Sequence, residues 1–360
     1  MKLEKYSRQT LLSNFGIEEQ HKLFEASVLV IGAGGLGCPV LEILNSSGVG
    51  KIGIVDFDII EIHNLHRQFL FQESDLGKSK AITAKEKLEK RNSDINIDVF
   101  NVRMTSKNIV SILENFDVVV DCTDNFSTRY LINDACSLLK KPLVYGSIYQ
   151  YEGQVSVFNV RKDGVSTQYR DLFPIPPNLD EAPNCNEAGV LPAHSSLIGT
   201  IQANEAIKVI IESADVLANQ LLVFNSLNYQ TMVINFNENH KKGGPKTIEE
   251  LQNFDYEEFC NLKKNDEINS EEELNAFLSQ NNSVLIDVRE LDEQPRITSF
   301  KNLEMPLSSL GEQMADLKIY NQICLICASG IRSRKALDII TKQFPEKIIK
   351  HFPAGVKALK

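Results

Sequence analysis

Four glycines follow the apolar run Val28 to Ile31 in a spacing that suits a phosphate. They form the pattern G-x-G-x-x-G with one further glycine inside it: Gly32, Gly34, Gly35 and Gly37. Glycines at a strand-to-helix turn let the backbone approach a phosphate, and the first N–H groups of the helix can bind it. A second apolar run ends at Asp56, where a carboxylate can reach a ribose hydroxyl. The pattern predicts a nucleotide-binding turn.

Charged residues gather in short clusters along the same part of the chain. The clusters are Asp56-Phe57-Asp58, Asn64 to Gln68 (NLHRQ), Gly77 to Lys80 (GKSK) and Asp121 to Asn125 (DCTDN), with Arg8 upstream. A dehydrogenase needs a nicotinamide site and an acid–base group, but it does not need an arginine, a lysine and a further carboxylate around the phosphates. Nucleotidyl transfer needs cations to neutralise phosphate charge and a carboxylate to hold Mg²⁺. The clusters favour nucleotidyl transfer, with an NAD-dependent oxidoreductase as the alternative.

A second candidate site lies near the C-terminus, in the segment CASGIRS that begins at Cys327. An apolar run precedes this cysteine, and the run Arg334 to Ile340 has the character of a helix. Backbone N–H groups at a helix N-terminus, together with the nearby Arg332, stabilise a thiolate and would equally stabilise a persulfide anion. Cys324 lies inside the expected strand, so we interpret it as a core residue.

The elements that must position these residues alternate between strand and helix. Apolar runs at 28–31 and 118–120 and the alternating residues 95–99 indicate strands, and helical spacing separates them. We predict an α/β protein with a doubly wound, Rossmann-like adenylating domain that has a mixed sheet, plus a small α/β domain. The predicted boundaries are residues 1–240, a linker over 241–265 that opens with a polar, glycine-containing stretch, and residues 266–360.

Composition excludes several classes of protein. The net charge of -10 argues against a nucleic-acid partner, because binding to phosphates requires basic surface. No apolar stretch is long enough to cross a membrane, and the polar start is not typical of a signal peptide. The chain contains seven cysteines, an odd number that favours a reducing, cytoplasmic location over a disulfide-bonded one.

Residues 5–236 resemble the ThiF/MoeB/HesA adenylyltransferases, relatives of the ubiquitin-activating enzymes. The resemblance rests on the segments SRQTLL, GAGGLG, DFD, NLHRQ, GKSKA, DCTDN, YRDLFP and CNEAGVLP. It implies that the protein uses ATP to activate the C-terminal glycine of a small ubiquitin-like sulfur carrier, which ends in Gly-Gly, as an acyl-adenylate. Nothing in the sequence selects the carrier, so molybdopterin and thiamin biosynthesis and tRNA thiolation remain open.

The resemblance also implies a role for each charged residue. Asp56 is expected to hold the ATP ribose, with Asp58 beside it, and Arg67 and Lys80 to contact phosphates. Asp124 is expected to bind or position Mg²⁺. Asn64 and Gln68 are expected to support the phosphate site. Arg8 resembles an arginine that reaches across a homodimer interface into the partner's site.

The first domain differs from many relatives in its cysteines. Cys185 lies in a long, proline-rich loop, where its roles as a covalent acceptor and as a dispensable residue weigh about equally. Many relatives bind a structural zinc through two C-x-x-C pairs. The corresponding positions here are Gln168 to Asp171 and Glu238 to Lys241, which contain no cysteine, so we expect no structural zinc.

Residues 266–360 resemble a rhodanese through VLIDVRE, MPLSSL, the CASGIRS loop and PAGVKAL. The resemblance implies that Cys327 carries a persulfide received from a sulfur donor such as a cysteine desulfurase. Asp287 and Arg289 are expected to brace the active loop. The combined interpretation is a homodimeric adenylyltransferase with a sulfurtransferase domain that gives the carrier a thiocarboxylate. A non-catalytic scaffold that docks the carrier and the donor is the remaining alternative.

Overall fold

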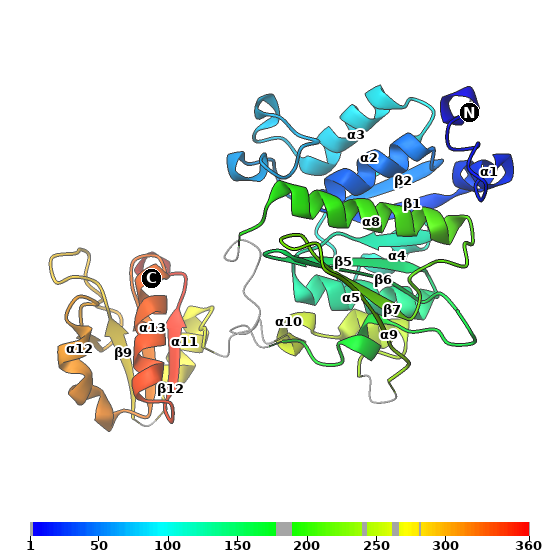
Figure 1. Ribbon diagram of the computed structural model, residues 1–360. Helices are drawn as coiled ribbons and strands as arrows, with labels where there is room; N and C mark the ends of the chain where they lie inside the picture. The colour runs from blue at the N-terminus through cyan, green and yellow to red at the C-terminus, as the bar shows by residue number, and fades with distance from the viewer. Residues whose placement is uncertain (1–2, 178–188, 240–242, 261–265, 281, 360) are drawn as a thin grey trace. The chain divides into compact units, whose positions relative to one another are not determined.

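The computed structural model describes residues 3–177, 189–239, 243–260, 266–280 and 282–359. The chain divides into two compact units, Met1–Leu262 and Lys263–Lys360. Each unit has its own sheet and its own hydrophobic core (Figure 1). None of the described helices is long and apolar enough to span a membrane.

The first unit is built on an eight-stranded sheet with the order β3-β2-β1-β4-β5-β6-β7-β8. Strands β1 to β5 are parallel to one another, and the pairs β5–β6, β6–β7 and β7–β8 are antiparallel. The strands are β1 Ser27–Ile31, β2 Lys51–Val55, β3 Asn96–Phe100, β4 Val118–Asp121, β5 Leu143–Tyr149, β6 Glu152–Phe158, β7 Gln220–Asn225 and β8 Thr231–Asn235. The mixed, doubly wound sheet confirms the predicted fold class.

Helices cover both faces of this sheet (Figure 1). Those on one face are α2 Gly37–Ser47, α3 Lys80–Arg91 and α8 Pro192–Ile210, and those on the other are α4 Ile109–Leu113, α5 Phe126–Leu139, α9 Ile248–Asn253 and α10 Tyr256–Phe259. Shorter or peripheral helices are η1 Leu3–Tyr6, α1 Ile17–Glu25, η2 Ile62–Asn64, η3 Glu73–Asp75 and α6 Tyr169–Leu172. In β1, Val28 and Val30 pack on the first face and Leu29 and Ile31 on the second. The strand is therefore apolar without alternation, as its sequence indicated.

Part of the segment predicted as a linker packs on the first unit. Helices α9 and α10 lie within residues 241–265 and contact α5. The Tyr256 hydroxyl donates to Asp134 Oδ2 at 2.9 Å, and Arg170 pairs with the same carboxylate at 2.7 Å. The Arg170 guanidinium also lies 4.5 Å from the ring centre of Phe259. The sequence analysis missed this contact because the buried ion pair joins residues far apart in the chain.

The second unit has a parallel, four-stranded sheet with the order β10-β9-β11-β12. Its elements are α11 Glu271–Leu278, β9 Ser283–Asp287, β10 Asn302–Glu304, α12 Leu310–Gln313, η4 Met314–Ile319, β11 Gln322–Ile326, α13 Ile331–Gln343, β12 Ile348–Phe352 and η5 Val356–Ala358. Helices α12 and α13 cover one face and α11 the other. The sheet therefore places the loop after β11 at the start of α13.

Candidate functional site

The glycine turn connects β1 to α2 beside the end of β4, where the order of the strands reverses. Gly32 has a φ of +97°, and a Cβ there would lie 2.8 Å from the carbonyl oxygen of Cys122. A Cβ on Gly37 would lie 1.9 Å from the carbonyl oxygen of Gly32. Both positions therefore require glycine, and the turn brings backbone N–H groups to the edge where nucleotides bind in such sheets.

Asp56 follows β2 and joins this strand to the glycine turn. Its Oδ2 accepts a hydrogen bond from Ala33 N at 2.7 Å, and its Oδ1 accepts one from Asp58 N at 2.8 Å. Burial raises the pKa of Asp56, although the charge of Lys80 and the two backbone donors act in the opposite direction. A carboxylate held against a glycine turn in this way fits a ribose hydroxyl as its remaining partner.

Lys80 lies at the first position of α3 and is only 6% exposed. Its ammonium group donates to Asp58 Oδ2 at 2.9 Å. The structure therefore places the two carboxylates of the DFD segment differently: Asp56 binds the glycine turn, and the exposed Asp58 holds the lysine. Burial of its stem fixes the lysine, so a phosphate could replace Asp58 as the partner of Nζ with little rearrangement.

The segment with Asn64, Arg67 and Gln68 rests on the glycine turn. Asn64 Oδ1 accepts from Arg67 Nη2 and from Gln68 Nε2, each at 3.3 Å. A Cβ on Gly35 would lie 3.4 Å from the side chain of Arg67, and one on Gly34 would lie 3.7 Å from Gln68. Gln68 Oε1 is buried and has no hydrogen-bond partner among the described residues. This unpaired acceptor beside the turn fits a ligand that brings a hydroxyl or amino donor.

Asp124 lies in the loop after β4. It is exposed and makes no hydrogen bond or ion pair with any described residue, so its oxygens can take a ligand. One free carboxylate beside a phosphate site fits Mg²⁺, which binds through one or two carboxylates plus phosphate oxygens and water.

Two buried side chains that the sequence analysis missed hold this loop. Arg129 Nε donates to Asp121 Oδ2 at 3.3 Å and Nη2 to the carbonyl of Thr123 at 2.8 Å. Gln202 Nε2, on α8, donates to the carbonyl of Asp121 at 2.7 Å. A basic residue five positions after Asp124 was the available signal, but its burial depends on tertiary packing.

Arg8 lies away from the phosphate site of its own chain. Gln9 Nε2 donates to the carbonyl of Ser47, and the Tyr6 ring packs against Gly48, so this segment rests on the C-terminal end of α2. The glycine turn is at the other end of that helix, which has 11 residues and is therefore about 16 Å long. Cys185 lies outside the described residues.

In the second unit, Cys327 follows β11 and is 1% exposed. Its Sγ lies 3.5 Å from Ser333 Oγ. Burial alone would raise the pKa of Cys327, but hydrogen bonds from the Ser333 hydroxyl and from the backbone N–H groups of Ser329, Arg332 and Ser333 outweigh it and lower the pKa. The loop therefore stabilises a thiolate, as its sequence predicted.

The side chain of Arg332 is already paired in this structure. Its Nη2 donates to Glu293 Oε2 at 2.7 Å, and Nη1 donates to the other carboxylate oxygen. This pairing lowers the pKa of Glu293 to about 2. Asp287 and Arg289 form a separate pair at 2.7 Å, and Arg289 also donates to the carbonyl of Pro295. The sequence analysis missed Glu293.

Three of the described positions that correspond to the zinc-binding segments of relatives are hydrogen bonded to one another. Asp171 Oδ2 accepts from Gln168 N at 2.8 Å, and Oδ1 accepts from Asn239 N at 2.7 Å. The carboxylate thus joins the two segments that a zinc ion would otherwise connect. One carboxylate without thiolates does not fit a four-coordinate structural zinc.

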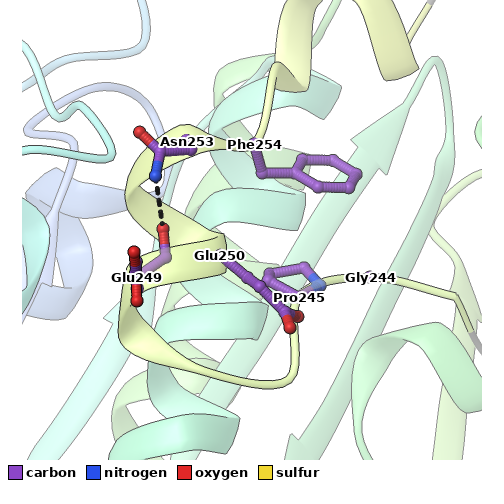
Figure 2. Close-up of a pocket in the computed structure, with 6 residues that line it drawn as sticks. All are labelled: Gly244, Pro245, Glu249, Glu250, Asn253 and Phe254. Atoms are coloured by element: carbon purple, nitrogen blue, oxygen red, sulfur yellow. Dashed lines mark hydrogen bonds between the residues drawn. The ribbon is translucent and has the colours of Figure 1, made fainter.

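A depression of about 470 Å³ lies over α9, lined by Gly244, Pro245, Glu249, Glu250, Asn253 and Phe254 (Figure 2). Within it, Asn253 Nδ2 donates to the carbonyl of Glu249 at 3.0 Å. None of its lining residues belongs to the nucleotide-binding turn or to the Cys327 loop, so we assign the depression no part in the chemistry of either site.

Comparisons with known proteins agree with the geometry. The ThiF family profile matches residues 6–245. "Adenylyltransferase and sulfurtransferase MOCS3" of Culex quinquefasciatus is 39% identical over 372 residues, which cover 96% of this chain and 83% of the relative. "Probable adenylyltransferase/sulfurtransferase MoeZ" of Mycobacterium tuberculosis is 37% identical over 368 residues, which cover 98% and 92%.

Among solved structures, the crystal structure of Escherichia coli MccB with ATP is similar with a TM-score of 0.58 and 25% identity, covering 65% of this chain and 72% of that chain. The two curated relatives extend through the second unit as well as the first. The resemblance noted from the sequence motifs is therefore confirmed. The chain belongs to the ThiF family.

Proposed function

We propose that this protein uses ATP to adenylate the C-terminal glycine of a small ubiquitin-like sulfur carrier, and that Cys327 then supplies sulfur as a persulfide. The observation that carries the first half is that Asp56, Arg67 and Lys80 gather around the glycine turn. Asp124 lies in the loop after the adjacent strand β4. A hydride-transfer enzyme has no use for this set of charges. The names of the two full-length relatives support the same pair of activities.

In the first step, Asp56 binds the ribose and Lys80 and Arg67 bind the phosphates. An oxygen of the carrier's terminal carboxylate attacks the α-phosphorus, and the bond to pyrophosphate breaks. Negative charge grows on the leaving pyrophosphate, and the two cations stabilise it. Asp124 would hold Mg²⁺, which supplies further charge neutralisation when bound.

In the second step, the Cys327 thiolate attacks the outer sulfur of a donor persulfide, such as one carried by a cysteine desulfurase. The terminal sulfur of the resulting Cys327 persulfide attacks the activated carbonyl, and AMP leaves. A second thiol then cleaves the sulfur–sulfur bond, which yields the thiocarboxylate and a disulfide. Cys185 remains our candidate for a covalent acceptor of the carrier's C-terminus.

We also propose a homodimer and a cytoplasmic location. The position of Arg8 at the far end of α2 supports the homodimer, because its side chain can serve a phosphate site only in a second copy. The carrier in this proposal serves molybdopterin or thiamin biosynthesis. We maintain the expectation of no structural zinc, which elemental analysis finding about one zinc per chain would contradict.

Mg²⁺-dependent exchange between ATP and pyrophosphate, measured with each candidate carrier, tests the proposal. Arg67→Ala and Asp124→Ala should each lower the exchange rate by about 10²-fold or more, the scale of one lost contact in the transition state. Arg161→Ala and Asp215→Ala are matched controls. Both residues are exposed and lie near the amino-terminal ends of the parallel strands, whereas the nucleotide site lies at their carboxyl-terminal ends. Exchange at the wild-type rate in both site variants would refute the assignment.

A further inference from the structure

A row of polar side chains leads from the buried sulfur of Cys327 toward solvent. Cys327 Sγ lies 3.5 Å from Ser333 Oγ, and Ser333 Oγ lies 3.3 Å from His351 Nδ1. His351 Nε2 lies 3.5 Å from Glu267 Oε1. The first three residues are at most 3% exposed, whereas the Glu267 side chain is 39% exposed. The row therefore begins in the core and ends at the surface.

The hydroxyl of Ser333 cannot satisfy all its neighbours in a single arrangement. It has one proton, but it lies within reach of the Gly330 carbonyl at 3.0 Å, the Cys327 sulfur and His351. When Cys327 is a thiol, its S–H can donate to Ser333 Oγ, and Ser333 can donate to His351 Nδ1. When the sulfur is negatively charged, Ser333 must donate to the sulfur and can then accept from His351. The sulfur's charge and the protonation of His351 are thus linked.

Charged side chains from two neighbouring segments surround the imidazole of His351. Glu267 and Asp266 approach the ring from the segment before α11, and Arg334 approaches from α13. Burial, together with the charge of Arg334, holds the pKa of His351 below its ordinary value, although Glu267 and Asp266 act in the opposite direction. A negative charge on the sulfur would raise this pKa again. Nε2 is buried, and the Glu267 carboxylate lies 3.5 Å from it. A proton on the imidazole would face the Glu267 carboxylate.

We infer that His351 accepts the thiol proton of Cys327 through Ser333. The S–H bond breaks as Ser333 Oγ takes this proton, and the original hydroxyl proton of Ser333 passes to His351 Nδ1. A thiolate and an imidazolium result, bridged by a neutral hydroxyl, with Glu267 stabilising the imidazolium. No electrons are transferred and no other reactant is needed. His351 is a positioning residue, because it acts on the sulfur only through Ser333.

The inference rests on the proposed function only for what the thiolate is used for. The proton transfer itself does not depend on sulfur transfer. Its test reads thiolate formation directly, through the rate at which iodoacetamide alkylates Cys327 in the full chain at different pH values. Mass spectrometry locates the modified residue, and Cys327→Ser gives the background from other cysteines. The protein could show the alkylation rates that the relay predicts and still transfer no sulfur. This result would refute the proposed function and support the relay.

Ser333→Ala and His351→Asn should each raise the thiol pKa by about one unit, which slows alkylation about tenfold at pH values below that pKa. Asparagine preserves a hydrogen-bond donor but cannot accept the proton. In the Ser333→Ala background, His351→Asn should have no further effect, since the path is already cut. Lys350→Asn is the matched control, because this neighbour on β12 points toward Phe277. An equal effect of His351→Asn in both backgrounds would refute the relay and indicate altered packing.

A second measurement does not depend on substituting His351. In nitrogen-15 NMR spectra, the imidazole should titrate together with the thiol in the native protein. Cys327→Ser should lower the pKa of His351, because the linked negative charge is gone. An unchanged titration of His351 in Cys327→Ser would overturn the inference.

Discussion

At the nucleotide site, Asp124 is exposed without a partner among the described residues. The half-buried Arg67 donates hydrogen bonds there only to Asn64 and to the carbonyl of His63. At the sulfur site, Cys327 is 1% exposed, and the Ser333 hydroxyl and several backbone N–H groups lie around its sulfur, where they stabilise a thiolate. At the first site, the glycine turn is held by its hydrogen bond to Asp56. The charged side chains near this turn have few hydrogen-bond partners. The second site has its stabilising groups in place before a substrate arrives.

This difference follows from what each site must stabilise. ATP brings several negative charges, and a site with all its cations buried and unpaired before binding would carry a large desolvation cost. A thiolate or persulfide is a single charge on a residue of the chain itself, so a ring of N–H groups can hold it permanently. We therefore expect the two sites to respond differently to substitution, to ligand and to pH.

The largest expected effect separates the two activities. Cys327→Ser should abolish persulfide acceptance and thiosulfate sulfurtransfer but leave ATP–pyrophosphate exchange intact, because the nucleotide site lies within Met1–Leu262. Asp124→Ala should show the reverse pattern. Both activities are measured on the same preparations. Loss of exchange in Cys327→Ser would mean that the two sites are not independent.

Mg²⁺ and ATP should organise the first unit and leave the second unchanged. At a ligand concentration of about 100 times Kd, binding stabilises the native state by about 2.7 kcal/mol. Hydrogen exchange should slow in the glycine turn and in residues 121–125, where donors and acceptors gain partners. Equal protection of the loop after β11 would contradict the contrast between the sites.

The lowered pKa of Cys327 makes a prediction with a definite sign. Alkylation should reach its plateau at a lower pH than for an ordinary thiol, because the thiolate forms earlier. Between the folded pKa and the higher unfolded pKa, the unfolded state binds more protons, so the stability of the second unit should rise with pH in this interval. The stabilisation is lost as pH falls through the folded pKa. Urea titrations at several pH values, with Cys327→Ser as the control, measure this dependence.

The sequence predicted both sites through residues that act within short segments. The glycine turn, Asp56 and the CASGIRS loop each depend on a strand, a turn and a helix start, and these are local patterns. The sequence analysis did not predict the roles of three residues that reach a site loop from another element of the fold: Arg129, Gln202 and His351. The packing of α9 and α10 on α5 escaped for the same reason: the Arg170–Asp134 pair forms only once the chain has folded.

The smallest expected effect concerns Glu293, the carboxylate that pairs with Arg332 of the Cys327 loop. Because its pKa is lowered to about 2, Glu293 stays ionised and keeps both outer nitrogens of Arg332 occupied at any working pH. Thiosulfate is an anion and must compete with this carboxylate, whereas a persulfide on a protein donor need not. Glu293→Gln should therefore raise kcat/KM for thiosulfate about three- to tenfold, mainly by lowering KM, because a neutral amide binds the guanidinium less strongly than a carboxylate does. Glu304→Gln is the control, since Glu304 pairs with Arg296 at 3.4 Å and not with the loop arginine. If kcat/KM for thiosulfate is unchanged in Glu293→Gln, the pairing of Arg332 with Glu293 does not limit the binding of anions. Small anionic donors would then reach the sulfur site more easily than this ion pair indicates.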